Sequence, residues 1–453
     1  MGIKYTSAYF QVILVGFICF CCPGMFNVLN SIGGGGLVDD NTSKYANVAI
    51  YTTFTVFGIL GGGIVNILGT KWSLAISGIG YAFYSASYLI YNATGAGGVV
   101  IFAGALLGAC AGVLWAAQGQ IMMAYATESN KGKYIATFWI IFNLGAVLGS
   151  IIPFALNYHQ KAGALGQGTY IGLIIVMLVG CAISLALAPI GKVVREDGTP
   201  VKITPYENVL SEAIGALKVF TDFKMLALLP LFLASNWFYT YQFDLYNGIL
   251  FNVRTRSFNN IWYWSMQMVG AFGIGKILDN SKMSRSKRGL YGLAALTIAF
   301  TAVWAGGLAF QNTFTKEDNK YFVIHEENPD AGKGIDFTHG KDYAGPLVLY
   351  MLYGLLDAML QSLSYWVMGS LSNDAQTLTR YAGFYKGIQS FGAAIAWGIS
   401  TSSASYLAQL IICWALLEIS VPGAFFVIKN ISDYGDDNQP GVTKNEIDLE
   451  AKS

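Results

Sequence analysis

The sequence predicts an all-α integral membrane protein with about twelve transmembrane helices. Of 453 residues, 54% are apolar and only 12% are charged. Soluble domains carry about 25% charged residues, so this composition excludes an ordinary soluble protein. The third observation is a series of twelve mostly apolar runs, each about as long as the 20 residues that an α-helix needs to cross a bilayer. The net charge of +1 predicts no nucleic-acid partner.

The twelve runs fall into two groups of six. The first group occupies residues 8–29, 46–69, 73–91, 98–125, 135–157 and 169–190. The second group occupies residues 224–248, 259–278, 289–310, 346–369, 382–401 and 406–428, of which the first two are the most polar. A break of about thirty residues separates the groups. The sequence therefore predicts an N-terminal bundle (1–191), a linker (192–223), a C-terminal bundle (224–428) and a tail (429–453).

The linker contains a predicted amphipathic helix. Its apolar residues recur at helical spacing: Val209, Leu210, Ala213, Ile214, Leu217 and Phe220. Such a helix could lie at the membrane surface or pack against the bundle, and the pattern favours neither position over the other.

Basic residues predict the orientation of the chain. With the N-terminus inside, 18 Lys and Arg residues fall on inner segments and 8 on outer loops. This bias predicts that both termini are cytoplasmic, although Arg254 and Arg256 run against it locally. The sequence does not indicate which cellular membrane holds the protein. Asn41 begins a glycosylation sequon in a predicted outer loop and is a candidate for modification.

Two similar segments follow the second and eighth predicted helices. The first, "GGGIVNILGTK", contains Gly62, Asn66, Gly69 and Lys71, and the second, "GIGKILDNSK", contains Gly275 and Asp279. Both resemble the Gly-x-x-x-Asp loop of the major facilitator superfamily. In that loop the glycine lets helices approach closely, and the carboxylate can cap a neighbouring helix and close the inner gate. Asn66 stands in place of the first carboxylate, which puts a charged latch there in doubt.

Longer segments carry a more specific resemblance. "PGMFNVLNSIGGGG" (23–36), "GVLWAAQGQIM" (112–122) and "KGKYIATFWIIFNLGAVLGS" (131–150) resemble the first half of the uncoordinated-ninety-three-like family, a branch of the major facilitator superfamily. "SNWFYTYQFDLYN" (235–247), "RTRSFNN" (254–260), "YGLLDAMLQSLSYWVMGSLSND" (353–374) and "RYAGFYKGIQSFGAA" (380–394) resemble its fungal members. The resemblance implies a twelve-helix facilitator fold whose helices one, four, seven and ten line a central cavity. It implies less about activity, because the family includes apparent transporters, ion-channel regulatory subunits and trafficking chaperones.

Polar side chains inside the predicted helices are candidates for the lining of that cavity, because an amide that faces lipid loses its hydrogen bonds. Trp115 and Gln118 share a face of helix four, and cavity lining is favoured for Gln118 over a helix–helix hydrogen bond. The further candidates that share a face with another polar or aromatic group are Asn27, Asn30, Asn143, Tyr241, Asp244, Gln361 and Gln389. For any one amide, a structural hydrogen bond between helices is an equal alternative.

The intramembrane charges all fall in the second half: Asp244, Asp357, Lys386 and Glu418. Asp357 lies near mid-membrane on a predicted cavity helix and is the preferred candidate, because a buried carboxyl group can gain and lose a proton as the cavity opens to either side. Depth along the helices argues against an Asp244–Lys386 ion pair. Lys386 is instead predicted to reach the cytoplasmic surface or to meet Asp374. Glu418 is predicted to be protonated or buried against a neighbouring helix.

Two functions remain open at this stage. The first is a secondary transporter that moves a small solute by alternating access, with a carboxylate that couples transport to protons or pairs with a cation. The second is a non-transporting regulatory subunit or chaperone of another membrane protein. Enzymatic activity, a cofactor and a metal site are not expected, because the three histidines lie in loops and no nucleotide or metal motif is present.

Overall fold

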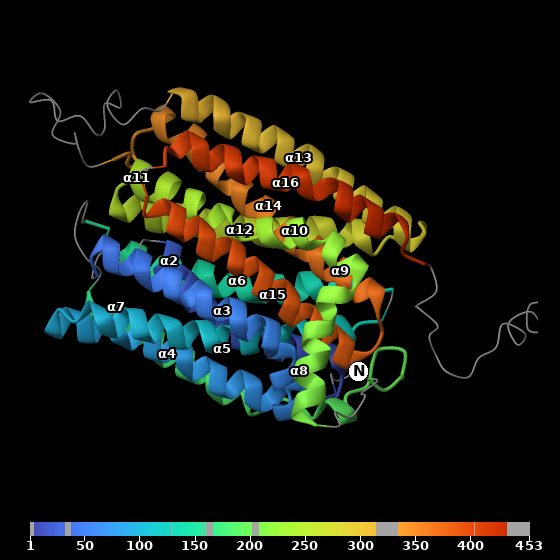
Figure 1. Cartoon of the computed structure of the whole chain (residues 1–453). Coiled ribbons are helices and arrows are strands. Elements are labelled where there is room, and N and C mark those ends of the chain that lie inside the picture. The colour runs from blue at the N-terminus through green and yellow to red at the C-terminus, as the bar shows by residue number, and fades with distance from the viewer. Residues whose placement is uncertain are drawn as a thin grey trace, which may run out of the picture.

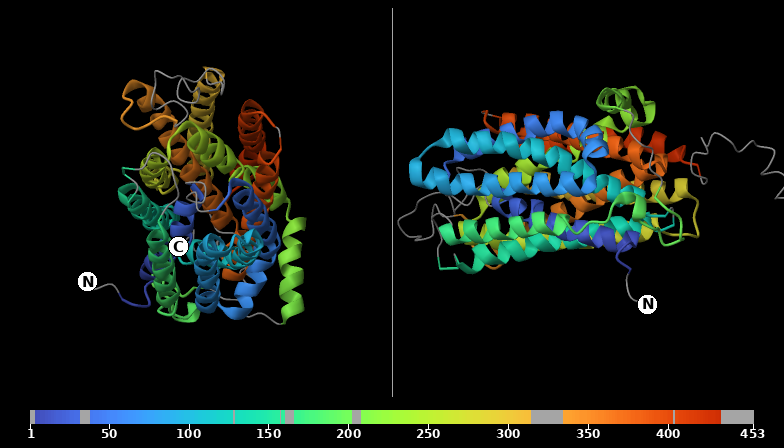
Figure 2. Two further views of the ribbon diagram at one scale, coloured as in Figure 1. Left: turned by 90° about the vertical axis from the view of Figure 1, so that its left-hand side faces the viewer. Right: turned by 90° about the horizontal axis from the view of Figure 1, so that it is seen from below.

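A computed structural model describes residues 4–31, 38–127, 129–156, 158–159, 166–201, 208–313, 334–402 and 404–432. Long helices run side by side along one axis, with the N-terminal half in blue and cyan below the C-terminal half in green to red (Figures 1 and 2). The N-terminal half contains α1 (Ala8–Cys21), α2 (Pro23–Ser31), α3 (Asp40–Leu68), α4 (Thr70–Thr94), α5 (Gly97–Ala124), α6 (Lys131–Leu156) and α7 (Gln167–Ser184). The C-terminal half contains α9 (Phe223–Ala227), α10 (Leu229–Ala234), η4 (Thr240–Asn247), α11 (Gly248–Leu250), α12 (Val253–Leu278), α13 (Arg285–Thr313), α14 (Lys341–Leu371), α15 (Ala375–Ser400) and α16 (Tyr406–Lys429).

The helices confirm the predicted fold class. Within the described residues, eight helical segments are long and apolar enough to cross a membrane. Three further helices of comparable length, α4, α12 and α15, occupy predicted runs but carry more polar residues. The seventh run is divided among short helices from α9 to α11. Together these elements account for all twelve predicted runs.

Two membrane helices are interrupted near the middle of the protein. The first changes from α1 to α2 at Cys22 and Pro23, because proline has no N–H to continue the hydrogen-bond ladder. The seventh breaks at residues 235–237, where the Ser235 hydroxyl group donates to the Phe232 carbonyl oxygen at 2.8 Å. The residues after the break, Thr240–Asn247, form a π-helix. Interrupted helices and π-helical turns are frequent at functional sites in membrane proteins.

The two halves meet mainly along two helix pairs, α3 with α15 and α6 with α12, and α5 also packs on α15. Glycines permit both approaches. A Cβ atom at Gly62 of α3 would lie 2.8 Å from Cα of Arg380, and one at Gly275 of α12 would lie 3.1 Å from the carbonyl oxygen of Gly132. Gly62 and Gly275 both lie inside helices, α3 and α12, rather than in the predicted loops. Gly69 does form the turn between α3 and α4, with a φ of 77° that favours glycine, and Lys71 lies in the first turn of α4.

The linker helix α8 (Val209–Lys218) crosses the ends of the long helices at the end of the molecule where α3 and α12 finish, which we call the linker end (Figure 1). Its polar side faces the protein, because Glu212 is 1% exposed, whereas Leu210 is 68% exposed. Val209, Ile214 and Leu217 are exposed as well. The amphipathic helix is thus present, and it packs on the bundle by its polar side and leaves its apolar side outward.

The predicted loop around Asn41 is helical. Asn41 lies in the first turn of α3, because the Asp39 side chain accepts a hydrogen bond from the Thr42 N–H and starts the helix six residues before the predicted run. Its side chain is exposed. Of the predicted tail, residues 433–453 lie outside the described residues.

Candidate functional site

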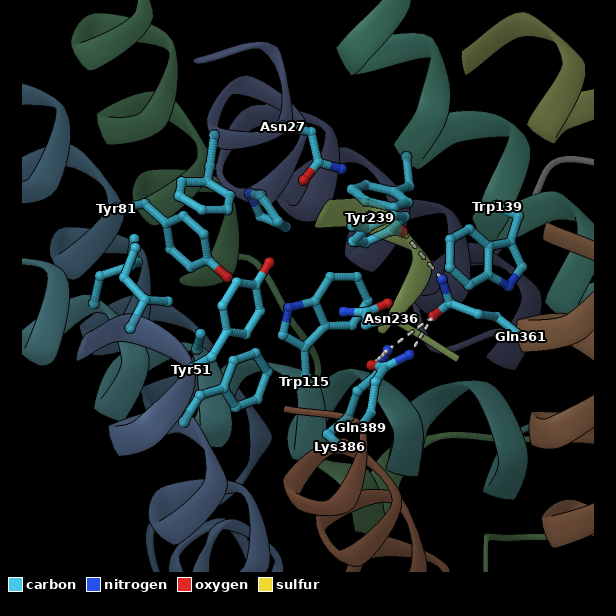
Figure 3. Close-up of a pocket in the computed structure, with 17 residues that line it drawn as sticks. Asn27, Tyr51, Tyr81, Trp115, Trp139, Asn236, Tyr239, Gln361, Lys386 and Gln389 are labelled. Carbon is cyan, nitrogen blue, oxygen red and sulfur yellow. Dashed lines mark hydrogen bonds between the residues drawn. The ribbon is translucent and has the colours of Figure 1, made fainter. Parts of the chain in front are cut away.

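A cavity of about 550 Å³ lies between the two halves (Figure 3). Its lining comes from α2, α3, α4, α5 and α6 of the N-terminal half, and from the interrupted seventh helix, α14 and α15 of the C-terminal half. The lining residues are Pro23, Phe26, Asn27, Ile50, Tyr51, Phe54, Tyr81, Leu107, Ala111, Trp115, Trp139, Phe142, Asn236, Tyr239, Gln361, Lys386 and Gln389. About half of the lining residues are aromatic, and the polar groups are mainly amides.

Lys386 is the one charged residue in this lining, and it is 3% exposed. Its ammonium group donates to Gln361 Oε1 at 3.1 Å and to Gln389 Oε1 at 2.8 Å. It also lies 4.4 Å from the ring centre of Trp115, a favourable cation–π distance. The prediction that Lys386 reaches the surface or Asp374 is wrong. The helix begins at Ala375, earlier than the predicted 382, so Lys386 is near its middle.

Asp357 lies behind this wall and is 1% exposed. Its Oδ1 accepts from Gln361 Nε2 at 2.7 Å, and its Oδ2 accepts from Gln267 Nε2 at 2.6 Å and Tyr239 Oη at 2.8 Å. A longer contact of 3.3 Å joins Oδ2 to Tyr263 Oη. Gln361 therefore bridges the ammonium group of Lys386 and the carboxyl group of Asp357. The structure brings the two charges into one network, which the sequence did not reveal.

Four polar groups at the cavity have no hydrogen-bond partner among the described residues. Asn236 Oδ1 and Trp139 Nε1 are buried and unsatisfied. The side-chain amide of Asn27 and the hydroxyl group of Tyr51 also line the cavity without a partner in the described part of the chain. Buried polar groups normally form hydrogen bonds, so we expect these four groups to form them with a ligand or with water.

Other sequence candidates lie away from the cavity. Gln118 is not in its lining; its Oε1 accepts from Tyr365 Oη at 3.0 Å and so joins α5 to α14. The favoured prediction of cavity lining for Gln118 is therefore replaced by its alternative, a helix–helix hydrogen bond. Asn143 donates to the backbone of Trp139 at 2.9 Å. Glu418 accepts from Thr301 Oγ1 at 2.8 Å and Trp414 Nε1 at 2.9 Å, between α13 and α16.

Helical spacing in the sequence places Tyr241 and Asp244 on one face of the seventh helix, and the structure shows that this prediction is wrong. Tyr241 donates to Gln311 at 2.8 Å, whereas Asp244 accepts from Ser400 at 2.7 Å and pairs with Lys44 at 3.5 Å. The π-helix explains the difference, because its wider turn breaks the i, i+4, i+7 rule of an α-helix. Asp244 and Asn30 instead line a second, more polar cavity of about 1170 Å³ at the end opposite the linker.

Four cavity residues were not predicted from the sequence: Tyr51, Tyr81, Asn236 and Tyr239. One signal was available for Asn236. The pair Ser235–Asn236 interrupts an apolar run, and interruptions of membrane helices point to binding sites. The tyrosines gave no such signal, since interfacial tyrosines are common in membrane helices.

The linker end is closed by carboxylates that cross between the halves. Asp279, which follows α12, accepts hydrogen bonds from the N–H groups of Gly132 at 2.7 Å and Lys133 at 2.5 Å, at the start of α6. Burial raises the pKa of Asp279, and these two hydrogen bonds offset that effect only in part.

At the equivalent place in the first half, Asn66 forms no such cap. Its Nδ2 donates to Glu212 of α8 at 3.0 Å, and Glu212 also accepts from Arg380 of α15 at 3.0 Å and from Gln376. The linker therefore supplies the carboxylate that the first gate segment lacks.

The opposite end is held differently. Lys44 of α3 and Asp244 form an ion pair across the halves, with side chains that are 18% and 19% exposed. Asn247 Nδ2 donates to the Ser31 carbonyl oxygen at 3.3 Å, and Arg254 Nη1 donates to the Tyr158 carbonyl oxygen at 2.8 Å. A further ion pair at this end, Arg254 with Asp336, is joined by two hydrogen bonds and lies within the C-terminal half.

Comparisons with known proteins agree with this architecture. Residues 35–301 match the family described as "Ion channel regulatory protein UNC-93". UNC93-like protein 1 of Arabidopsis thaliana is 46% identical over 95% of this chain and 93% of its own length. An UNC93-like protein of Schizosaccharomyces pombe is 44% identical over 92% of this chain and 81% of its own length, so the similarity extends to plants as well as fungi.

Solved structures share the fold at low sequence identity. The major facilitator superfamily transporter FucP in its outward conformation superposes with a TM-score of 0.62 at 11% identity, covering 93% of this chain and 99% of FucP. The human organic anion transporter MFSD10 superposes with a TM-score of 0.58 at 12% identity, covering 94% of this chain and 100% of its own. The chain therefore belongs to the UNC-93 family and has the fold of the major facilitator superfamily.

Proposed function

We propose that this protein is a secondary transporter that moves a small solute by alternating access. The observation that carries the proposal is the cavity between the halves, with unsatisfied polar groups and a Lys386–Gln361–Asp357 network in and behind its wall. Transporters of this architecture bind their solutes at such an interface. A purely structural interface would bury apolar contacts there instead of unpartnered polar groups.

Contacts at both ends of the cavity support alternating access. Opening of the linker end requires the caps made by Asp279 and Glu212 to break, and opening of the opposite end requires the Lys44–Asp244 pair to break. From the excess of basic residues, we place the linker end and both termini in the cytoplasm. A reporter fused after residue 453 should then be cytoplasmic, and one inserted near Lys333 should lie outside. Both reporters on one side would contradict this topology.

Asp357 is the group that we assign to proton coupling. Its carboxylate is stabilised by donors from four side chains and by the nearby ammonium group of Lys386, yet it has no contact with bulk water in this arrangement. Loss of any of these contacts as the halves move would leave a buried charge that is costly to maintain. Protonation of Asp357 removes that cost, so the proton and the conformational change are linked.

The test is uptake of radiolabelled hexoses, pentoses and cyclitols into proteoliposomes with an imposed pH gradient. Asp357→Asn keeps the size of the side chain but cannot titrate, so it should retain solute binding and exchange and lose accumulation driven by the gradient. Glu418→Gln is the matched control, because it neutralises an intramembrane carboxyl group outside the cavity. Unchanged gradient-driven uptake in a folded Asp357→Asn protein would refute the coupling role.

The second candidate function is a non-transporting regulatory subunit or trafficking chaperone of another membrane protein. The observation that favours it is the description of the matching family as ion channel regulatory proteins. It predicts that the wild type moves no solute under any gradient. It also predicts that binding of the partner membrane protein is insensitive to Asp357→Asn.

A further inference from the structure

The unpartnered groups around the cavity indicate the chemistry of its ligand. They are the amides of Asn27 and Asn236, the Tyr51 hydroxyl group and the Trp139 indole N–H. Amides and hydroxyls can each donate and accept, whereas the indole only donates. A ligand that satisfies this mixed set needs groups that both donate and accept in several directions. Hydroxyl groups have this property, and carboxylates, which only accept, do not.

The charges in and behind the cavity wall favour an uncharged ligand. The Lys386 ammonium group is compensated by Asp357 through Gln361, so the pair carries no net charge when both groups are ionised. The ammonium group is also occupied by two amide oxygens and by the Trp115 ring. A cationic ligand would be repelled by Lys386, and an anionic ligand would have to compete with Asp357 for it.

The aromatic lining favours a ring with apolar faces. Eight of the seventeen lining residues are aromatic: Phe26, Tyr51, Phe54, Tyr81, Trp115, Trp139, Phe142 and Tyr239 (Figure 3). Aromatic faces bury the C–H faces of a ring, while polar groups at the edges hold its substituents. The lining residues come from both halves and enclose a narrow space, which suits a single small ring rather than a chain or a large amphiphile.

We propose that the cavity binds an uncharged ring with several hydroxyl groups, of the monosaccharide or cyclitol class. Asn27, Tyr51, Asn236 and Trp139 would hold its hydroxyls, and the aromatic side chains would cover its faces. This ligand class refines the proposed transport function, but the binding site itself does not depend on translocation.

Equilibrium binding to the purified full-length protein in nanodiscs tests the ligand class. The probes are a radiolabelled set of hexoses, pentoses and cyclitols, together with a charge series on one ring: glucose, glucosamine and glucuronate. Uncharged members of the set should bind. Glucosamine and glucuronate, the charged rings, should each bind more weakly than glucose. Absence of binding by every uncharged ring, or tightest binding by glucuronate, would overturn the proposal.

Variants that keep an aromatic ring test the site. Trp139→Phe and Tyr51→Phe each remove one hydrogen-bonding group and retain an aromatic ring, so each should weaken binding by about fivefold. Trp264→Phe is the matched control, because Trp264 Nε1 is also buried and unsatisfied but lies outside the cavity lining. Equal effects of Trp139→Phe and Trp264→Phe would overturn the assignment.

Transport measurements separate this inference from the proposed function. Binding of an uncharged ring without movement across the membrane would refute transport and leave the ligand class standing. Uptake of an anion or a cation, with no binding of uncharged rings, would refute the ligand class and leave transport standing.

Discussion

The two ends of the cavity are closed by different arrangements of charge. At the linker end, the carboxylates of Asp279 and Glu212 themselves make the contacts between the halves. At the opposite end, the Arg254–Asp336 ion pair lies within one half, and the partly exposed Lys44–Asp244 pair joins charges across the halves. Charge therefore contributes to different properties at the two ends: to the balance between conformations at the linker end, and mainly to the stability of one half at the opposite end.

This comparison predicts that the largest loss of stability comes from a residue that does not control the gates. Asp336→Asn should lower the free energy of unfolding by about 3 kcal/mol, because it removes the buried carboxylate charge that accepts two hydrogen bonds from the Arg254 guanidinium group. Spin labels placed across each end should report unchanged distances. A large change in either distance would show that the Arg254–Asp336 pair is part of the gate.

The same variant carries a pH signature. Burial of Asp336 would raise the pKa of its carboxyl group, but hydrogen bonds from Arg254, Asn252 and Thr338 outweigh burial and hold that pKa well below the usual range. A carboxyl group with a lowered folded-state pKa stabilises the protein above its unfolded-state pKa of about 3.9 and loses this effect as pH falls below it. The difference in Tm between wild type and Asp336→Asn should be constant from about pH 7 to 5 and narrow below about pH 4.

A control for this pH signature lies at the same end. Hydrogen bonds from Thr42 and Tyr91 lower the pKa of the exposed Asp39 to about 2. Asp39→Asn should show a pH dependence of the same sign and a smaller loss of stability. A loss as large as that of Asp336→Asn would indicate that burial of the Arg254 pair is not the cause.

Glu212→Gln is predicted to have the largest effect on the gates. It removes the charge on the linker helix α8 that pairs with Arg380 of α15. The loss should destabilise the state with a closed linker end by about 2 kcal/mol. Spin labels across that end should show a larger open population. Glu196→Gln is the control, because its pair with Lys133 at the same end is exposed.

A second substitution tests whether Glu212 replaces a missing carboxylate. Asn66→Asp in the Glu212→Gln background places a charge on α3 near Arg380 and Gln376, the residues that Glu212 now contacts. It should restore part of the closed population. No recovery in a folded double variant would mean that α8 contributes more than its carboxylate.

Asp279→Ala is expected to act in the same direction with a smaller effect. It removes the cap of α6, which is typically worth about 1 kcal/mol. Ser405→Ala removes a cap within one helix, α16, and should lower Tm without opening the linker end. Equal opening in both variants would contradict the view that crossing contacts set the gate.

The sequence predicted the fold because length and hydropathy suffice for membrane helices, whereas their ends were less predictable. The first turns of α15 are polar but helical, since Asp374 caps them by accepting the Thr377 N–H. Hydropathy placed the start of this helix at 382, and that error displaced Lys386 from the centre of the membrane to its edge. A capped polar turn at a helix end cannot be recognised from hydropathy alone.

The candidate site was predicted in part. Asn27, Trp115, Gln361 and Gln389 do line the cavity, and Asp357 lies directly behind it. Gln118 does not, because Tyr365 on a helix 247 residues away satisfies its amide oxygen. Helical spacing identifies residues that share a face, but the identity of what that face meets depends on contacts between distant helices. The π-helix at Thr240–Asn247 altered even the shared face.

The smallest effect is predicted for the Lys44–Asp244 pair. Both side chains are partly exposed, so solvent screens the charges and the pair should contribute less than about 1 kcal/mol to the closed state. Lys44→Gln should therefore open the opposite end only slightly, and the wild-type distance across that end should increase with salt because ions screen the pair further. The distance in Lys44→Gln should not respond to salt. Labels across the linker end provide the control, since the buried Glu212 contact is shielded from ions. If Lys44→Gln opened its end as widely as Glu212→Gln opens the linker end, the two ends would be equivalent and the contrast in their charge arrangements would have no functional consequence.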